Sequence, residues 1–145
     1  MIFVDTWAWL AIAYAKDPYH AAASRQHKMF RRQKRHYVTT DYVLTELISA
    51  LFGAVPFGMA KQFMTNLFQS IDSGRHRLEL VTPDRFRRAY NLRLRYHDKP
   101  DISFVDFTSM VVMQELSIAE VFTGDAHFLQ VGLGFRLLQI GRAHV

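Results

Sequence analysis

The chain has 145 residues, of which half are hydrophobic and 14% aromatic, so the composition excludes a disordered protein and allows one domain with a hydrophobic core. It has no cysteine, which excludes disulfides and thiolate metal sites and fits a reducing compartment such as the cytoplasm. The net charge of +5 favours an anionic partner, and nucleic acid is the usual one.

Strands and helices are expected to alternate from the start of the chain. The apolar run from Ile2 to Val4 is typical of a short buried strand, and the Ala-rich stretch after it favours a helix. Asp41 is expected to cap a later helix that stops at Gly53. In chain order, we expect strand 2–4, helix 6–15, helix 19–34, strand 36–40, helix 42–53 and helix 59–71.

The second half of the chain continues this alternation. Pro83 suits the first turn of a helix. We expect strand 77–82, helix 83–96, helix 103–116, strand 119–123, a helical turn at 125–130 and strand 135–138. Because strands alternate with helices, the sequence predicts an α/β fold of Rossmann-like type, with a central parallel sheet flanked by helices.

The two ends of the chain need separate interpretation. The opening apolar stretch contains Asp5 and lacks a basic region before it, so we do not expect a signal peptide. No apolar run approaches the roughly 20 residues that cross a bilayer, so we expect no membrane segment. Residues 141–145 resemble a translated sequencing adapter, and we expect a domain at 1–140 followed by a non-native tail.

Four acidic residues stand where a metal site is expected in such a fold. Asp5 and Asp125 each follow a predicted strand, Asp106 lies in the first turn of a helix, and Glu46 lies about one turn into another. Because sites in parallel sheets form beyond the carboxyl ends of the strands, we expect these carboxylates at one edge. A carboxylate cluster of this kind suits Mg²⁺ or Mn²⁺.

Each acid also has a purely structural interpretation. Asp5 and Asp125 can cap helices, Ser103 and Asp106 form an S-x-x-D capping box, and Glu46 can lie on a solvated helix face. Acids gathered at one edge repel one another unless a cation is present, however. The combination therefore favours a metal site.

The chain resembles the PIN domain family of small metal-dependent ribonucleases. The stretches that carry the resemblance are "FVDTWAWLA", "TTDYVLTELISAL" and "DKPDISFVDFTSMVVMQELSIAEVFTGDAHFLQVGLGF". The resemblance implies that Asp5, Glu46, Asp106 and Asp125 hold Mg²⁺ or Mn²⁺ and that the protein is an endoribonuclease. Two departures are Pro100, which looks like an extra loop residue, and Gly124, where the family often has a larger residue.

Within the family, the small free-standing domain is most similar to the toxin of a VapC-type toxin–antitoxin pair. That resemblance implies a cytoplasmic homodimer held inactive by a cognate antitoxin. Three alternatives stay open: an RNA-processing PIN nuclease outside such a pair, a non-catalytic RNA-binding module, and a phospho-acceptor domain of receiver type. A receiver domain needs a Lys after a late strand, where this chain has only Arg136.

A basic stripe is predicted on the helix at 19–34. Its members share helical spacing and are Arg25, Lys28, Arg32 and Arg35, whereas Arg31 and Lys34 lie off it. The stripe can follow an RNA backbone or form an ordinary solvated face. Near the acids, Ser103 and Thr123 can position water or phosphate. His127 can face substrate, although a structural role is more common for a lone histidine.

Overall fold

The fold is built on five parallel strands that occur in the order β3-β2-β1-β4-β5. The structure is a computed structural model and describes residues 1–138. The strands are β1 (Ile2–Val4), β2 (Tyr37–Thr40), β3 (Arg77–Glu79), β4 (Glu120–Phe122) and β5 (Arg136–Leu138). The predicted α/β class and parallel sheet are therefore confirmed.

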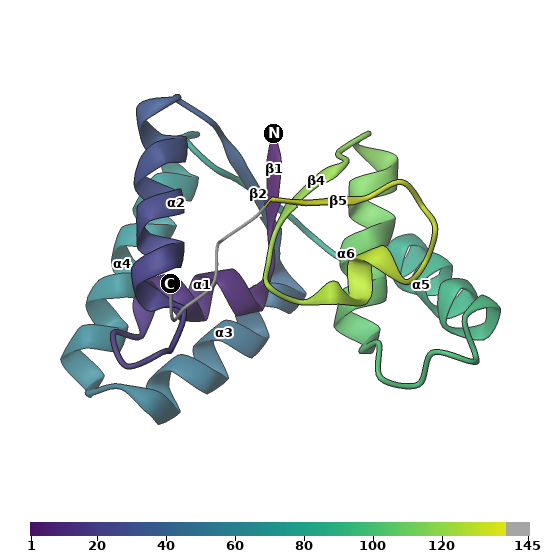
Figure 1. The fold of residues 1–145 in the computed structure, drawn as a ribbon, viewed down its shortest axis with the longest axis horizontal. Helices are drawn as coiled ribbons and strands as arrows, with labels where there is room; N and C mark the ends of the chain where they lie inside the picture. The colour runs from purple at the N-terminus through teal and green to yellow at the C-terminus, as the bar shows by residue number, and fades with distance from the viewer. Residues whose placement is uncertain (139–145) are drawn as a thin grey trace.

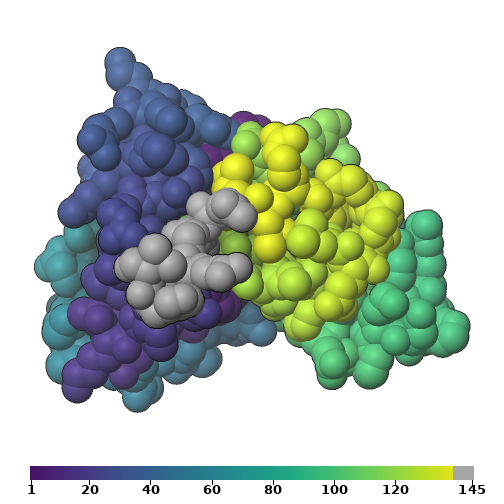
Figure 2. Space-filling view, viewed as in Figure 1, coloured from purple at the N-terminus to yellow at the C-terminus, as the bar shows by residue number. Residues whose placement is uncertain are grey.

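Helices cover both faces of this sheet. Helices α1 (Thr6–Ala13), α2 (His20–Arg32), α3 (Asp41–Ala54) and α4 (Phe57–Asp72) lie on one side of the strands, and α5 (Pro83–Arg95) and α6 (Phe104–Glu115) lie on the other (Figure 1). A short 3₁₀ helix, η1 (Ala126–Leu129), follows β4. In the space-filling view, the purple-to-blue first part of the chain and the green-to-yellow last part occupy opposite halves of the visible face (Figure 2).

The central strand β1 fixes the position of the first acid. All three of its residues are fully buried, as expected for a strand covered by helices on both faces. Phe3 is in register with Val38 of β2 and with Val121 of β4. Asp5 is the next residue after β1. It therefore lies at the carboxyl end of the central strand of the sheet.

Two helix boundaries differ from the predictions for local reasons. Helix α2 ends at Arg32 because Lys34 adopts a left-handed conformation with φ 57°, so Arg35 does not continue the helix. Helix α4 begins at Phe57, directly after Pro56, where a loop was expected.

The predicted capping role of Asp41 is wrong. The cap of α3 is Thr40, whose hydroxyl accepts a hydrogen bond from the Val43 N–H at 3.0 Å. The carboxylate of Asp41 instead accepts a hydrogen bond from the Val81 N–H at 2.8 Å and so ties α3 to the segment after β3. Helix α3 also runs through Gly53 and ends at Ala54.

The expected tail at 141–145, and with it the domain limit at 140, lies outside the described residues. Among the residues that are described, no helix is both long enough and apolar enough to cross a bilayer.

Candidate active site

Three of the four predicted acids converge at the carboxyl edge of the sheet. Asp5 follows β1 and Asp125 follows β4, and these two strands are neighbours in the sheet. Asp106 reaches the same place from the first turn of α6. The chain supplies these carboxylates from positions 101 and 19 residues apart, and the parallel sheet brings them together.

Asp5 is the most deeply enclosed of these acids, with only 4% of its surface exposed. Burial raises its pKa to about 7, helped by the neighbouring Asp106 and, to a smaller extent, Asp125. The Thr123 hydroxyl donates a hydrogen bond to its Oδ2 at 2.9 Å and opposes part of this effect. The surroundings of Asp5 therefore favour its neutral form over the carboxylate anion.

Asp106 takes part in the cap at the start of α6, and its carboxylate lies among the other site residues. The Ser103 hydroxyl accepts a hydrogen bond from the Asp106 N–H at 3.1 Å, as in a capping box. The carboxylate is buried, and its Oδ2 lies 3.0 Å from Nδ1 of His127. Burial raises the pKa of Asp106, Asp125 adds to this effect, and His127 opposes it.

Asp125 and His127 complete a cluster of potential ligands. The Asp125 Oδ1 accepts a hydrogen bond from the His127 N–H at 2.9 Å, and its Oδ2 lies 3.0 Å from His127 Nδ1. Asp106, Asp125 and His127 each offer a ligand atom, and these atoms lie within 4.8 Å of one another. The imidazole thus bridges two carboxylates that would otherwise repel each other.

Thr123 connects this cluster to Asp5. Its hydroxyl donates to Asp5 and accepts a hydrogen bond from the Asp125 N–H at 3.0 Å. The sequence suggested Thr123 as a residue that positions water or phosphate, whereas its hydrogen bonds here hold two of the acids in place.

Glu46 lies beside the cluster rather than within it. Its side chain is exposed on α3 and accepts a hydrogen bond from the Thr6 hydroxyl at 2.9 Å. Thr6 directly follows Asp5, so this bond fixes Glu46 next to the start of α1. A shallow depression at this point is lined by Thr6, Thr45, Glu46, Ser49 and Ala50. Sequence reasoning missed Thr6, although its position next to Asp5 was a usable signal.

Gly124, one of the two departures from the family pattern, is explained by a tryptophan. A Cβ at this position would lie 2.2 Å from an atom of the Trp7 indole. Trp7 in turn packs against Tyr19, with ring centroids 5.1 Å apart. The glycine therefore allows the indole to pack against the Thr123–Asp125 segment.

The predicted basic stripe is only partly continuous. Arg25, Lys28 and Arg32 are exposed on α2. Arg35 lies beyond the end of the helix, and its guanidinium forms an ion pair with Glu120 at 2.6 Å. Three cations therefore remain on the helix face, and Arg35 ties that end of α2 to β4.

Comparison with known proteins identifies the family. The PIN domain family model matches residues 2–133. The 23S rRNA-specific endonuclease VapC20 of Mycobacterium tuberculosis is 30% identical over 132 residues, which cover 91% of this chain and 95% of the relative. The crystal structure of VapC20, described as a sarcin–ricin loop cleaving toxin, superposes with a TM-score of 0.76 at 29% identity, over 91% of this chain and 95% of that one. This chain belongs to the PIN domain family and, within it, to the VapC-type proteins.

Proposed function

We propose that this protein is a metal-dependent endoribonuclease and the toxin of a VapC-type toxin–antitoxin pair. The observation that carries the proposal is the convergence of Asp5, Asp106 and Asp125 at one edge of the sheet. Two of these acids are buried with raised pKa values, so their environment favours a neutral group or a bound cation. The near full-length similarity to VapC20 supports the same chemistry.

The residues present fit a hard divalent cation. The donor atoms are carboxylate oxygens, which Mg²⁺ and Mn²⁺ prefer, and the mutual repulsion of the acids is what such a cation relieves. We propose Asp5, Asp106 and Asp125 as ligands, with Glu46 at the edge of the site, where it can act directly or through water. When bound, the ion supplies positive charge to the scissile phosphate and activates a water molecule as the nucleophile.

The protein's own groups would orient these ligands. Thr123 holds the carboxylate of Asp5, and Thr6 holds that of Glu46. His127 contacts both Asp106 and Asp125 through Nδ1 and so fixes their relative position. These contacts preorganise the acids before substrate arrives, which reduces the reorganisation needed during reaction.

The test uses an RNA hairpin that carries the sarcin–ricin loop, since this is the target named for VapC20. Cleavage should occur in Mg²⁺ or Mn²⁺ and stop in EDTA. Asp106→Asn should abolish cleavage, and it should also remove the rise in melting temperature that Mn²⁺ causes in the wild type. The Ser103 cap uses the backbone of residue 106 and survives this change.

Asp72→Asn is the matched control, because Asp72 is an exposed acid at the end of α4. It should keep both cleavage and the Mn²⁺-induced shift. An Asp106→Asn protein that keeps the wild-type shift would limit Asp106 to its capping role. A wild type that binds RNA but never cleaves it, and shows no metal response, would instead support the non-catalytic RNA-binding module.

The proposed partners are RNA, a cognate antitoxin and a second copy of the chain, in the cytoplasm. The alternative function is an RNA-processing PIN nuclease outside a toxin–antitoxin pair. The two roles share the active site and differ in regulation. A small reading frame for a DNA-binding protein next to this gene, whose product blocks RNA cleavage when mixed with this chain, would support the toxin.

A further inference from the structure

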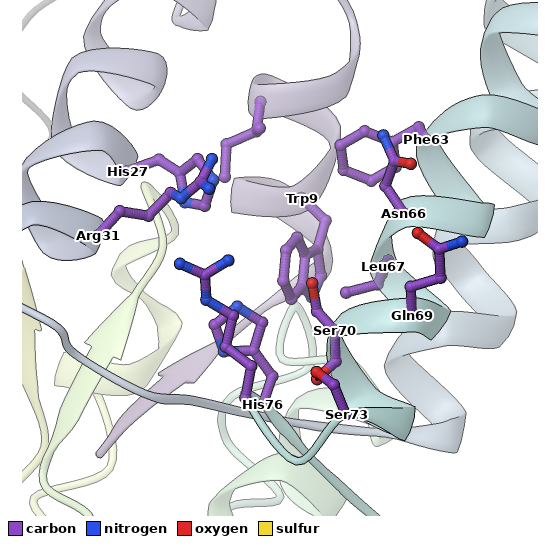
Figure 3. A pocket seen from close by; sticks show the side chains of 12 residues that line it. Trp9, His27, Arg31, Phe63, Asn66, Leu67, Gln69, Ser70, Ser73 and His76 are labelled. Carbon is purple, nitrogen blue, oxygen red and sulfur yellow. The ribbon is translucent and has the colours of Figure 1, made fainter.

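A second concave site lies away from the acids. It is a pocket of about 530 Å³ between α1, α2, α4 and the segment that leads into β3. Its lining residues in Figure 3 come from these elements, with the Trp9 indole facing the space between α2 and α4. This volume lies within the range of small-molecule sites.

The basic residues of the pocket lie near the amino ends of strands β2 and β3, whereas the acids follow strands. Arg75 and His76 immediately precede β3, and Arg31 lies in the last turn of α2, before β2. The acids Asp5 and Asp125 follow strands. Because the strands have only three or four residues, the two edges are roughly 10–13 Å apart along the sheet. The basic residues of the pocket therefore form a group separate from the acids, at a distance that one extended nucleic-acid strand can span.

The lining of the pocket has two chemically different walls. Trp9, Ile12, Phe63 and Leu67 form an apolar wall, and the Trp9 and Phe63 rings pack edge to face at 6.4 Å. The other wall carries His27, Arg31, Arg75 and His76. Four polar side chains that can donate or accept hydrogen bonds complete the lining: Asn66, Gln69, Ser70 and Ser73.

The charge of the second wall is not balanced by any acid. Within the described part of the chain, no carboxylate lines the pocket. Among residues 1–138, neither the Arg31 nor the Arg75 guanidinium forms an ion pair, although other arginines such as Arg35 and Arg85 do. Burial lowers the pKa values of both His27 and His76 to about 4; Arg31 and Arg75 add to this effect at His27, and Arg75 adds to it at His76, which is consistent with a positive field in the pocket.

This combination of groups matches the parts of a nucleotide. A pair of guanidinium groups can bind a phosphate, an aromatic wall can pack against a base, and carboxamides such as Asn66 and Gln69 can bond to base edges. We propose that this pocket binds one nucleotide unit, with its phosphate between Arg31 and Arg75 and its base against Trp9 and Phe63. The unit is either a free nucleotide or a nucleotide of the RNA substrate distant from the cleaved bond.

The test measures binding of each of the four nucleoside 5′-monophosphates, in EDTA, by titration calorimetry and by quenching of tryptophan fluorescence. EDTA makes the result independent of the metal site, so failure of the nuclease proposal would not affect it. Arg31→Gln combined with Arg75→Gln should weaken binding about tenfold or more, the scale of lost charge-assisted hydrogen bonds. Phe63→Ala should also weaken nucleotide binding, because it removes a ring that packs against the base and leaves the phosphate contacts in place.

The matched control is Arg87→Gln combined with Arg95→Gln, two exposed arginines of α5 on the other side of the sheet. It removes the same net charge and should leave nucleotide affinity unchanged within about twofold. The steady-state kinetics of RNA cleavage then show whether the pocket binds a nucleotide of the RNA substrate or a free nucleotide. If the pocket holds an RNA nucleotide, the pocket variant raises KM with kcat unchanged. If it holds a free nucleotide, KM stays the same while monophosphate binding is lost.

Two results would overturn the proposal. One is the absence of saturable binding of any monophosphate at millimolar concentration, together with an unchanged KM in the pocket variant. The other is a pocket variant that loses affinity only for an acidic peptide, with nucleotides and RNA unaffected, which would make the pocket a protein-docking site.

Discussion

At the scale of single residues, Asp5 links the chemistry of the site to the stability of the fold. Its pKa rises from an ordinary 3.8 to about 7 on folding, so the folded state favours the protonated form. The ionised, buried carboxylate therefore destabilises the folded protein above pH 7. This destabilisation decreases as the pH falls from 7 towards 4, and it is absent below pH 4. The difference between these pKa values corresponds to at most about 4 kcal/mol.

Asp5→Asn should therefore abolish cleavage yet stabilise the metal-free protein at pH 8. We expect a rise in the free energy of unfolding of about 1–3 kcal/mol at pH 8 and little change at pH 4. Urea unfolding in EDTA at both pH values measures this directly. A variant that is less stable than the wild type at pH 8 would show that the carboxylate makes contacts that outweigh its burial.

The Trp7 side chain determines which residue position 124 can hold. Because a Cβ would overlap the Trp7 ring, Gly124→Ala should cost about 1–3 kcal/mol, the range for overpacking. It should also lower cleavage activity, since Asp125 is the next residue. Adding Trp7→Leu removes the indole atoms that clash, so the double variant should recover part of the stability. Additive losses in this double-mutant cycle, measured by thermal melts, would exclude the clash as the cause.

The site residues that could be predicted from the sequence are marked by a local pattern, and those that could not be predicted depend on contacts between distant positions. Asp5, Asp106 and Asp125 were found because each follows a strand or opens a helix, and the parallel sheet then brings them to one edge. The contacts Thr6–Glu46 and Arg35–Glu120 join positions 40 and 85 residues apart, which no local pattern encodes. The Gly124–Trp7 packing is hidden in the same way, because only the folded chain brings the two together.

At the scale of elements, strand β2 depends on two neutral histidines. His27 of α2 forms a hydrogen bond of 2.8 Å between its Nδ1 and the Tyr37 hydroxyl, and His76 Nδ1 accepts one from the Tyr37 N–H at 3.2 Å. The His76 ring also stacks on the Tyr37 ring with centroids 4.7 Å apart. Helix α2 and the start of β3 are thus joined to β2 through one tyrosine.

This arrangement predicts loss of stability in mild acid. Burial lowers both histidine pKa values from 6.5 to about 4, so the folded state resists protonation that the unfolded chain accepts. Stability should be complete above pH 6.5 and fall between pH 6.5 and pH 4. Because both rings are only half-buried, solvent screening reduces the effect to about 1–2 kcal/mol each.

The measurement is the melting temperature between pH 7.5 and pH 4.5, for the wild type and for His76→Gln. The variant should be less stable at pH 7.5 but lose less on acidification. His97→Gln, at an exposed position after α5 on the other side of the sheet, is the control and should follow the wild type. Parallel curves for all three proteins would show that other groups cause the acid sensitivity.

At the scale of the whole molecule, the predicted element order was accurate while the helix ends were not. Buried strands read as continuous apolar runs, so β1 and β4 were found close to their true limits. The ends of α2 and α4 depend on the conformations of Lys34 and Pro56. Contacts with neighbouring elements determine where these helices begin and end, and hydrophobic periodicity does not indicate those positions.

Two exposed apolar faces bear on the proposed homodimer. One is the corner of α3 and α4 around Phe52 and Phe57, whose rings pack at 5.9 Å. The other is the α5 row of Phe86, Tyr90 and Leu94. Helix α5 is rich in arginine, and two copies of it would repel each other. The corner of α3 and α4 carries few charges, as the centre of a self-complementary interface requires.

We therefore expect Phe57→Arg to convert a homodimer into a monomer, because it places a cation at the most exposed aromatic of that corner, where Phe57 is 71% exposed. Leu94→Arg is the matched control on α5, where Leu94 is 53% exposed, and it should leave the dimer intact. Light scattering coupled to gel filtration gives the mass of each protein. If Leu94→Arg alone produces the monomer, the α5 row forms the interface despite its charge, and the corner of α3 and α4 becomes the candidate surface for the antitoxin.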